Sequence, residues 1–210
     1  MTTAGSRLRW APHTDVGRVR PANEDNCAAN GRVFVVADGM GGHLAGEVAS
    51  EMAVATLMEA LGSTPPGAFA DDAVQVFDAV AEANLRIYES SVESAERHGM
   101  GTTLTALVLV GSGAEQQLAL VNVGDSRTYV LRDGVLEQLS IDHSYVQELV
   151  SAGQITKEDA RHHPHRNIVT RALGIEPRVA IDGWRMPLVR GDRFLLCSDG
   201  LSDEISDDQT

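Results

Sequence analysis

Two short apolar runs, each followed by an Asp-Gly pair, most constrain how this chain can fold. Residues 33–37 run into Asp38-Gly39, and residues 194–197 run through Ser198 into Asp199-Gly200. Short apolar runs bounded by turn residues are typical of buried strands. A buried carboxylate without a partner is costly, so each aspartate is expected to be paired, hydrogen-bonded or bound to a metal ion.

The rest of the sequence divides into a helical first part and a strand-rich second part. Residues 44–61 and 71–99 have the apolar spacing of amphipathic helices. The later segments with strand texture are 103–110, 117–125, 127–134, 135–140, 180–189 and 192–200. Short turns join the first four of these, so they are predicted to form an antiparallel meander, with a plain hairpin turn at Asp133-Gly134. Long helices beside antiparallel strands predict an α+β fold with helices on the outer faces of the sheets.

Composition narrows the class of function. A length of 210 residues with 43% hydrophobic residues predicts one globular domain. The net charge of -13 argues against nucleic acid or an anionic membrane as a partner. The sequence has neither an apolar run of about 20 residues nor a secretory signal, so a cytoplasmic location without a membrane is expected. Cys27 and Cys197 fit neither a metal-ligand pair nor a disulfide framework.

Acidic residues follow three of the predicted strands. These are Asp38, Asp125 and Asp199, and a fourth acidic position is the pair Glu24-Asp25 in "RPANEDN". Carboxylates that converge at strand ends provide the oxygen ligands that Mg2+ and Mn2+ prefer. Asp-Gly is also a common turn dipeptide, so any one pair taken alone fits a plain turn better than a metal site.

Five motifs occur in order and cover nearly the whole chain: "RPANEDN", "VVADGMGGHLAGEVAS", "GMGTTLTAL", "VNVGDSRTYVLRDG" and "LLCSDGLSD". Together they resemble the bacterial metal-dependent serine/threonine protein phosphatases of type 2C. The resemblance implies a four-layer α-β-β-α sandwich of two antiparallel sheets flanked by helices. It also implies one phosphatase domain over residues 1–210, with a flap-like insertion at residues 142–174 and a two-metal centre at one end of the sandwich.

The resemblance assigns a metal role to three residues. Asp38 would bridge two Mn2+ or Mg2+ ions, Gly39 would supply its carbonyl, and Asp199 would hold the first ion. Two such ions offset the charge of a phosphate monoester and make a bound water nucleophilic. No cysteine or serine nucleophile is then required, and the sequence has no G-x-S-x-G motif.

Four further residues match the family pattern. Glu24 and Asp25 match the acidic pair that binds or orients metal-bound water, and Asp125 together with Asp199 matches a third, weaker metal position. Arg20 matches the arginine that binds the substrate phosphate, a bidentate contact that lysine would not reproduce.

The sequence departs from the family pattern in two places. Members usually close with a strand preceded by Gly-x-x-Asp-Asn, and this chain stops before such a motif. We therefore expect a C-terminally truncated domain that lacks the closing strand and binds metal less tightly. Met40 stands where relatives from higher organisms often have histidine, so the leaving group must take its proton from metal-bound water or another residue.

The histidines allow more than one interpretation. The cluster "HHPHR" at residues 162–166 fits an exposed loop better than a zinc site, because its histidines do not share a helix face. His43 fits a packing or turn role as well as a catalytic one. Residues 142–174 as a whole are either a functional flap or a passive surface excursion.

The leading hypothesis is a monomeric phosphatase that hydrolyses phosphoserine and phosphothreonine on proteins, including a serine/threonine kinase or its substrates. A catalytically impaired pseudophosphatase that only binds phosphoproteins is the alternative. A two-metal phosphodiesterase or nuclease would use similar ions, but the charge of -13 disfavours a polyanionic substrate.

Overall fold

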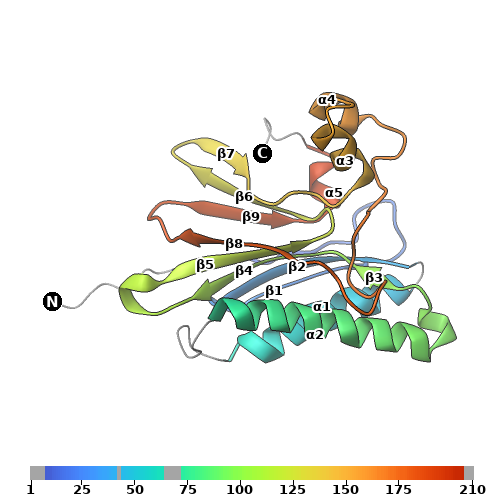
Figure 1. Cartoon of the computed structure of the whole chain (residues 1–210), viewed down its shortest axis with the longest axis horizontal. Coiled ribbons are helices and arrows are strands. Elements are labelled where there is room, and N and C mark those ends of the chain that lie inside the picture. Colours follow the sequence, from blue (N-terminus) through green and yellow to red (C-terminus); the bar gives the residue numbers. More distant parts are fainter. Residues whose placement is uncertain (1–7, 42–43, 64–71, 206–210) are drawn as a thin grey trace.

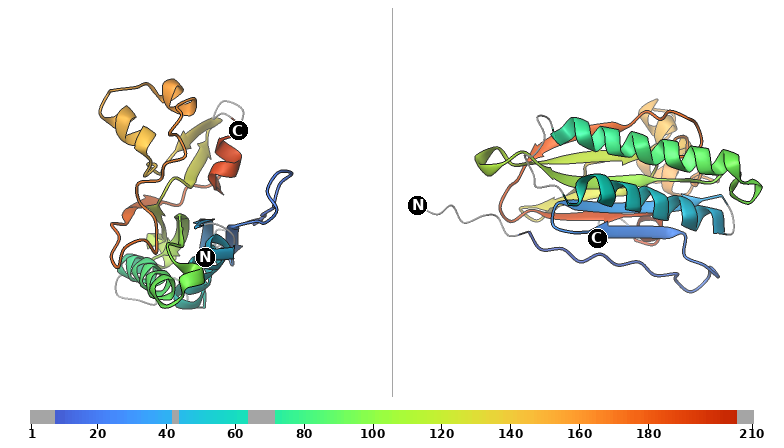
Figure 2. Two further views of the ribbon diagram at one scale, coloured as in Figure 1. Left: turned by 90° about the vertical axis from the view of Figure 1, so that its right-hand side faces the viewer. Right: turned by 90° about the horizontal axis from the view of Figure 1, so that it is seen from below.

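Two antiparallel sheets face each other in the computed structural model, which describes residues 8–41, 44–63 and 72–205 (Figures 1 and 2). The larger sheet has the order β1-β2-β4-β5-β8, with β3 paired to β2. Its strands are β1 (Asp25–Ala29), β2 (Val33–Met40), β3 (Gly101–Thr102), β4 (Leu104–Val110), β5 (Gln117–Val123) and β8 (Asp182–Pro187). The smaller sheet has the order β7-β6-β9, formed by β6 (Arg127–Arg132), β7 (Val135–Gln138) and β9 (Arg193–Cys197). The predicted α+β class with two antiparallel sheets is confirmed.

Two long helices, α1 (Leu44–Leu61) and α2 (Asp72–Glu93), cover the outer face of the larger sheet (Figure 2). Three short helices lie at one end of the smaller sheet: α3 (Tyr145–Ser151), α4 (Lys157–Arg161) and α5 (Asp199–Ser202) (Figure 1). Two 3-10 turns, η1 (Ala95–Arg97) and η2 (Gly113–Glu115), lie in connections. Within the described residues, none of the helices combines the length and apolarity that crossing a membrane requires.

The larger sheet takes part in two hydrophobic cores. Alternate residues of β2, including Val33 and Val35, pack against α1 and α2. Phe34 points the other way, into the core between the two sheets, where Leu107 and Leu120 are buried. Strand β4 is buried on both faces, which explains why its sequence is apolar at every position except Thr105 instead of alternating.

The predicted meander is wrong at one turn. Strand β5 pairs with β8, and the chain crosses at Gly124 to the other sheet, where β6 begins. The crossing is stabilised by two hydroxyl side chains that follow Gly124. They hydrogen-bond across the space between the sheets to a residue of β4 and to the residue that precedes β4. The Ser126 and Thr128 hydroxyls lie 2.6 and 2.7 Å from those of Thr103 and Thr105. The hairpin expected between β6 and β7 is confirmed: Asp133 and Gly134 have φ values of 52° and 81°, as a type I′ turn requires.

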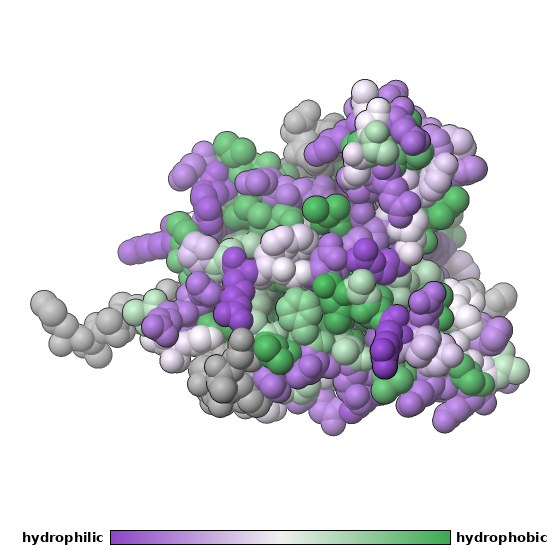
Figure 3. All heavy atoms as spheres, viewed as in Figure 1, coloured by the Kyte–Doolittle hydropathy of each residue, from purple (hydrophilic) through white to green (hydrophobic). Residues whose placement is uncertain are grey.

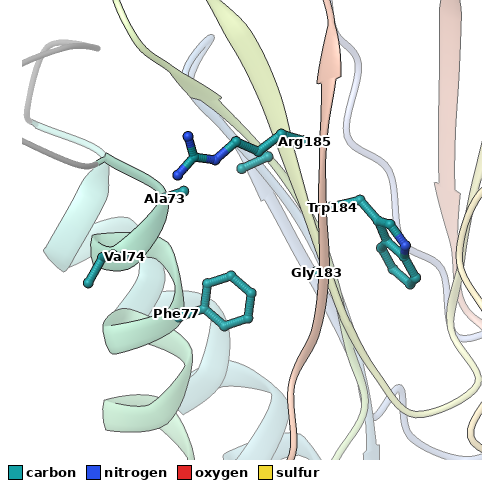
Figure 4. Close-up of a pocket in the computed structure, with 7 residues that line it drawn as sticks. Ala73, Val74, Phe77, Gly183, Trp184 and Arg185 are labelled. Atoms are coloured by element: carbon teal, nitrogen blue, oxygen red, sulfur yellow. The ribbon is translucent and has the colours of Figure 1, made fainter.

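Hydrophobic side chains gather in the middle of one face of the molecule, over the strip between β8 and α2 (Figure 3). A pocket opens there, lined by Ala73, Val74, Phe77, Ala119, Gly183, Trp184 and Arg185 (Figure 4). Phe77 points toward Gly183, where an added Cβ would lie only 2.3 Å from the ring. The lining contains no carboxylate, so this pocket is separate from the predicted metal ligands.

Candidate metal centre

Asp38 lies inside a strand, opposite a second carboxylate. The expectation that the strand ends at Asp38 is wrong, because β2 continues to Met40 by pairing with β1 on one side and β3 on the other. In the β1–β2 register, Asp25 is the direct partner of Asp38. Directly opposed residues of an antiparallel pair project from the same face, so two like charges stand side by side.

The smaller sheet brings a third carboxylate to the same place. Asp199 is the first residue of α5, just after β9. The preceding hydroxyl, Ser198 Oγ, donates a hydrogen bond of 2.7 Å to Asp25 Oδ2, which joins the ends of β9 and β1. Burial, the charges of Asp25 and Asp199, and hydrogen bonding with both raise the pKa of Asp38 to about 9. Three carboxyls thus meet where the sheets come together, and their repulsion favours either a shared proton or a cation.

Asp125 lies close to this group, in the crossing between β5 and β6. Burial first, and then the charges of Asp199 and Asp142, raise its pKa to about 7. Asp125 is therefore near enough to Asp199 for their charges to interact, and its role in a third metal position stays a prediction.

Glu24 and Gly39 lie where β2 passes the first turn of α1. The Gly39 N–H donates to the Glu24 carbonyl at 3.1 Å, and a Cβ on Gly39 would lie 2.0 Å from the Gly46 carbonyl oxygen. Only glycine fits so close an approach of two backbones. The Glu24 side chain also lies against Gly46, and its Oε1 atom is buried with no hydrogen-bond partner among the described residues. A buried carboxylate oxygen without a partner calls for an ion or a water molecule.

Two threonines that sequence reasoning did not single out fix the backbone of Asp38. Thr103 Oγ1 accepts from the Asp38 N–H at 3.0 Å, and the Thr103 N–H donates to the Asp38 carbonyl at 2.8 Å. Thr102 Oγ1 donates to the same carbonyl at 2.9 Å. Both threonines are essentially buried. The only signal in the sequence was their place in the motif "GMGTTLTAL".

Arg20 is exposed and lies outside both sheets, in the arm formed by residues 8–22 (Figure 2, dark blue). This arm also contacts the body, where Trp10 packs edge-on against Phe34. Within the part of the chain that the structure describes, none of the hydrogen bonds or ion pairs involves its guanidinium group. Its predicted contact with phosphate stays a prediction.

The histidine cluster lies in the exposed turn that follows α4. His165 donates its backbone N–H to Nδ1 of His163 at 3.1 Å, and Tyr145 lies about 6 Å from both rings. This agrees with the expected loop. His43 lies outside the described residues.

The chemistry of the carboxylate cluster fits a hard divalent cation. All of its donors are oxygens, and Glu24 Oε1 is buried without a partner in the part of the chain that the structure describes. Among residues 8–41, 44–63 and 72–205, however, no three His, Cys, Asp or Glu side chains converge as a ready-made ion site. The carboxyl groups are close enough to repel and hydrogen-bond one another, but metal coordination also requires their oxygens to point at one position. The charge and oxygen donors of these residues fit a divalent cation, whereas their side chains do not surround a single position.

Comparison with known proteins gives a consistent family. Residues 18–210 match the family "Protein phosphatase 2C". The "Serine/threonine phosphatase stp" of Listeria monocytogenes is 44% identical over 198 residues, which cover 91% of this chain and 77% of the relative. The "Serine/threonine protein phosphatase PstP" of Mycobacterium tuberculosis is 44% identical over 205 residues, which cover 96% of this chain but only 38% of the relative.

Solved structures agree with the sequence relatives. A crystal structure of Mycobacterium tuberculosis PstP is 43% identical, has a TM-score of 0.86, and is matched over 96% of this chain and 82% of that chain. A second structure, of the PstP catalytic domain in complex with two manganese ions, is 41% identical with a TM-score of 0.81, matched over 95% of this chain and 81% of that chain. Sequence and structure together show that this chain belongs to the protein phosphatase 2C family.

Proposed function

We propose that this protein is a metal-dependent phosphatase that hydrolyses phosphoserine and phosphothreonine on proteins. The observation that carries the proposal is the meeting of Asp25, Asp38 and Asp199 at the junction of the two sheets. Family membership supports it, because the relatives are named serine/threonine phosphatases and one of their structures contains two manganese ions.

In this proposal Asp38, Gly39 and Asp199 hold two Mn2+ or Mg2+ ions, with Glu24 and Asp25 binding or orienting metal-bound water. The ions, when bound, supply an activated water and offset the phosphate charge. Thr102 and Thr103 keep the Asp38 backbone in place, so its carboxylate needs little reorganisation when the ions bind.

Two residues act at the edge of this centre. Arg20, on its exposed arm, binds phosphate oxygens of the substrate through its planar guanidinium group. Asp125, beside Asp199, contributes to a third and weaker metal position.

A cysteine-dependent mechanism is disfavoured. A nucleophilic cysteine needs a lowered pKa, since the thiolate is the reactive form. Burial raises the pKa of the Cys27 thiol, and Cys197 is buried at the end of β9. Neither cysteine therefore has the environment of a catalytic thiolate.

The substrates in this proposal are phosphorylated proteins, including a serine/threonine kinase or its targets in the cytoplasm. The enzyme acts as a monomer and as one domain over residues 1–210, in which residues 142–174 form the flap beside the site. The pseudophosphatase alternative is not favoured, because Arg20, Asp38 and Asp199 are all present in this chain.

The decisive experiment measures phosphate release from a phosphothreonine peptide as Mn2+ is added. We expect no turnover in excess chelator, recovery with Mn2+, and loss of activity in Asp38→Asn. The matched control is Asp78→Asn, which removes an exposed carboxylate from α2 and should keep full activity. Turnover that is independent of metal would contradict the proposal.

A further inference from the structure

Hydrogen bonds hold both the N–H and the carbonyl group of Gly124, the residue before Asp125. The Gly124 carbonyl accepts from Asn122 Nδ2 at 3.1 Å and from the His143 N–H at 2.9 Å. The Gly124 N–H donates to His143 Nδ1 at 3.0 Å. We call these three residues, Asn122, Gly124 and His143, the Gly124 clamp. All three are buried, so the clamp is shielded from competition with water.

The position of Gly124 leaves little freedom to Asp125, the next residue in the chain. The φ of Gly124, 103°, lies in the region that favours glycine, and an added Cβ would lie 2.6 Å from the Thr103 side chain. Because both peptide groups of Gly124 are fixed, the direction in which the chain places Asp125 is fixed as well.

The His143 ring is itself oriented by its other nitrogen. Nδ1 accepts from Gly124, while Nε2 lies 3.2 Å from Asp182 Oδ2 and 2.8 Å from Nη1 of Arg171. The same Nη1 donates to Asp182 Oδ1 at 2.8 Å. Burial lowers the pKa of His143, which keeps Nδ1 free to accept. Asp182 and Arg171 thus fix the ring, and the ring fixes Gly124.

His143 also lies where the two ends of the segment 142–174 come together. Its carbonyl accepts from the Thr170 N–H at 2.8 Å, so the outgoing and returning arms of the segment meet there. A second anchor lies at Gly174, whose N–H donates to Asn84 Oδ1 of α2 at 2.9 Å. Leu173 with Thr102 and Asp142 with Arg127 also tie the segment to the body. Among these described anchors, the one at His143 touches the residue before Asp125.

We propose that His143 is a positioning residue that aims the Asp125 carboxylate through the Gly124 peptide and couples the segment 142–174 to it. The inference rests on the proposed function, because it takes Asp125 to contribute to a weak metal position. Its consequence is that breaking the bond between Gly124 N–H and His143 Nδ1 weakens ion binding at Asp125 and leaves the sites around Asp38 intact.

Two substitutions at His143 separate this bond from general packing. The amide oxygen of His143→Asn can occupy the place of Nδ1 and still accept from Gly124, whereas His143→Gln places its amide near Nε2 and loses that acceptor. We expect His143→Gln to raise the Mn2+ concentration for half-maximal activity by roughly tenfold, and His143→Asn by no more than about twofold. Asn84→Ala, which loosens the anchor at Gly174, is the control and should leave the Mn2+ dependence unchanged.

Ion binding is measured separately from activity by the electron paramagnetic resonance signal of free Mn2+. His143→Gln should lose the weakest bound ion and keep the tight ones. In the background of Asp125→Asn, His143→Gln should have no further effect on either measurement. Equal effects of the two His143 variants, or an undiminished effect of His143→Gln in that background, would overturn the inference.

Misfolding of the variants and failure of the proposed function can each be distinguished from failure of this inference. If neither His143 variant folds, as judged by circular dichroism, Asn122→Ser removes the other side-chain bond to Gly124 and must weaken the same ion. A wild-type protein without Mn2+-dependent turnover would contradict the proposed function itself, whereas normal turnover with equivalent His143 variants contradicts only the role of the clamp.

Discussion

The two sheets are built differently, although both supply the carboxylate cluster. The larger sheet has a mostly apolar interior covered by α1 and α2, and its central strand β4 is buried on both faces. The smaller sheet is half exposed along β7 and is tied by charged pairs, Arg127 with Asp142 and Arg132 with Asp192. Asp25 and Asp38 come from the first sheet and Asp199 from the end of the second. The relative positions of these three carboxylates therefore depend on how the apolar larger sheet and the more polar smaller sheet pack together.

The contact between the sheets itself changes along its length. Away from the carboxylates it is made of leucines such as Leu107 and Leu120. Near them it is made of buried hydroxyl pairs, Thr103 with Ser126 and Thr105 with Thr128. Apolar contacts tolerate sliding, whereas hydrogen bonds are directional. The polar end of the interface is thus the part that fixes the relative position of the two sheets at the site.

The largest effect should come from removing either sheet's carboxylate. If both sheets hold the same ions, Asp38→Asn and Asp199→Asn should each reduce kcat/KM by about 10³-fold or more, because a lost metal ligand removes charge stabilisation in the transition state. Phosphate release from a phosphopeptide in saturating Mn2+ measures this. A much smaller loss for Asp199→Asn would mean that the larger sheet alone makes the centre.

The next largest effect should come from breaking the ion pair between Arg127 and Asp142 in the smaller sheet. Arg127→Met leaves the Asp142 carboxylate, which is 7% exposed, without its 2.7 Å partner. A buried charge that loses its partner costs about 3 kcal/mol of unfolding free energy. Urea denaturation measures it. If the loss falls below about 1 kcal/mol, the smaller sheet does not depend on this pair.

The carboxylate cluster should also make metal-free stability depend on pH. Asp38 has a folded-state pKa of about 9, raised from its ordinary value, so the folded protein keeps a proton that the unfolded chain loses. In chelator, stability contributed by Asp38 is present at low pH and falls as pH rises toward 9, by at most about 1.4 kcal/mol per pH unit. Thermal melts from pH 5 to 8 measure the slope, and Asp38→Asn should flatten it. An unchanged slope in that variant would show that Asp38 does not hold the proton.

Arg20 tests the part of the site that lies outside both sheets. If it binds substrate phosphate, Arg20→Ala should raise KM by roughly tenfold, the loss of one charge-assisted hydrogen bond. Arg20→Lys should recover only part of this, because lysine cannot form the bidentate contact. Steady-state kinetics with a phosphopeptide measure both, and an unchanged KM would remove Arg20 from the substrate site.

The smallest effect should come from the pair whose arginine is exposed. The Arg132 side chain is 45% exposed and lies 2.6 Å from Asp192, whose own side chain is 3% exposed. Because water reaches the Arg132 guanidinium group and screens the pair, Arg132→Ala should cost less than Arg127→Met in urea denaturation. An equal or larger cost would show that the exposure of the arginine does not set the contribution of the pair.

Much of the fold could be predicted from the pattern of the sequence. Helices α1 and α2 and most strands follow from their apolar spacing, and the turn at Asp133-Gly134 from its residue types. Strand β1 was missed because "DNCAA" contains no β-branched or aromatic residue, and its pairing with β2 makes it a strand. The crossing at Gly124 was missed because a short turn between two strands is usually a hairpin. Only the tertiary structure shows that β5 and β6 pair with other strands.

The candidate site was predicted only in part. The Asp-Gly pairs pointed to Asp38 and Asp199, and the family resemblance supplied the roles of the other ligands. The opposition of Asp25 to Asp38 is a matter of register between strands, which no local pattern encodes. The buried hydroxyls of Thr102 and Thr103 gave no signal of their own, because their partner is a backbone that becomes a neighbour only after folding.

The hydrogen bond from Ser198 to Asp25 joins positions 173 residues apart. During synthesis, a ribosome must therefore release nearly two hundred residues before this junction can close. Contacts so distant in sequence form late and slowly. A nascent chain would keep Asp199 apart from Asp25 and Asp38 throughout that time, and so could not remove phosphate from other proteins before its own folding was complete.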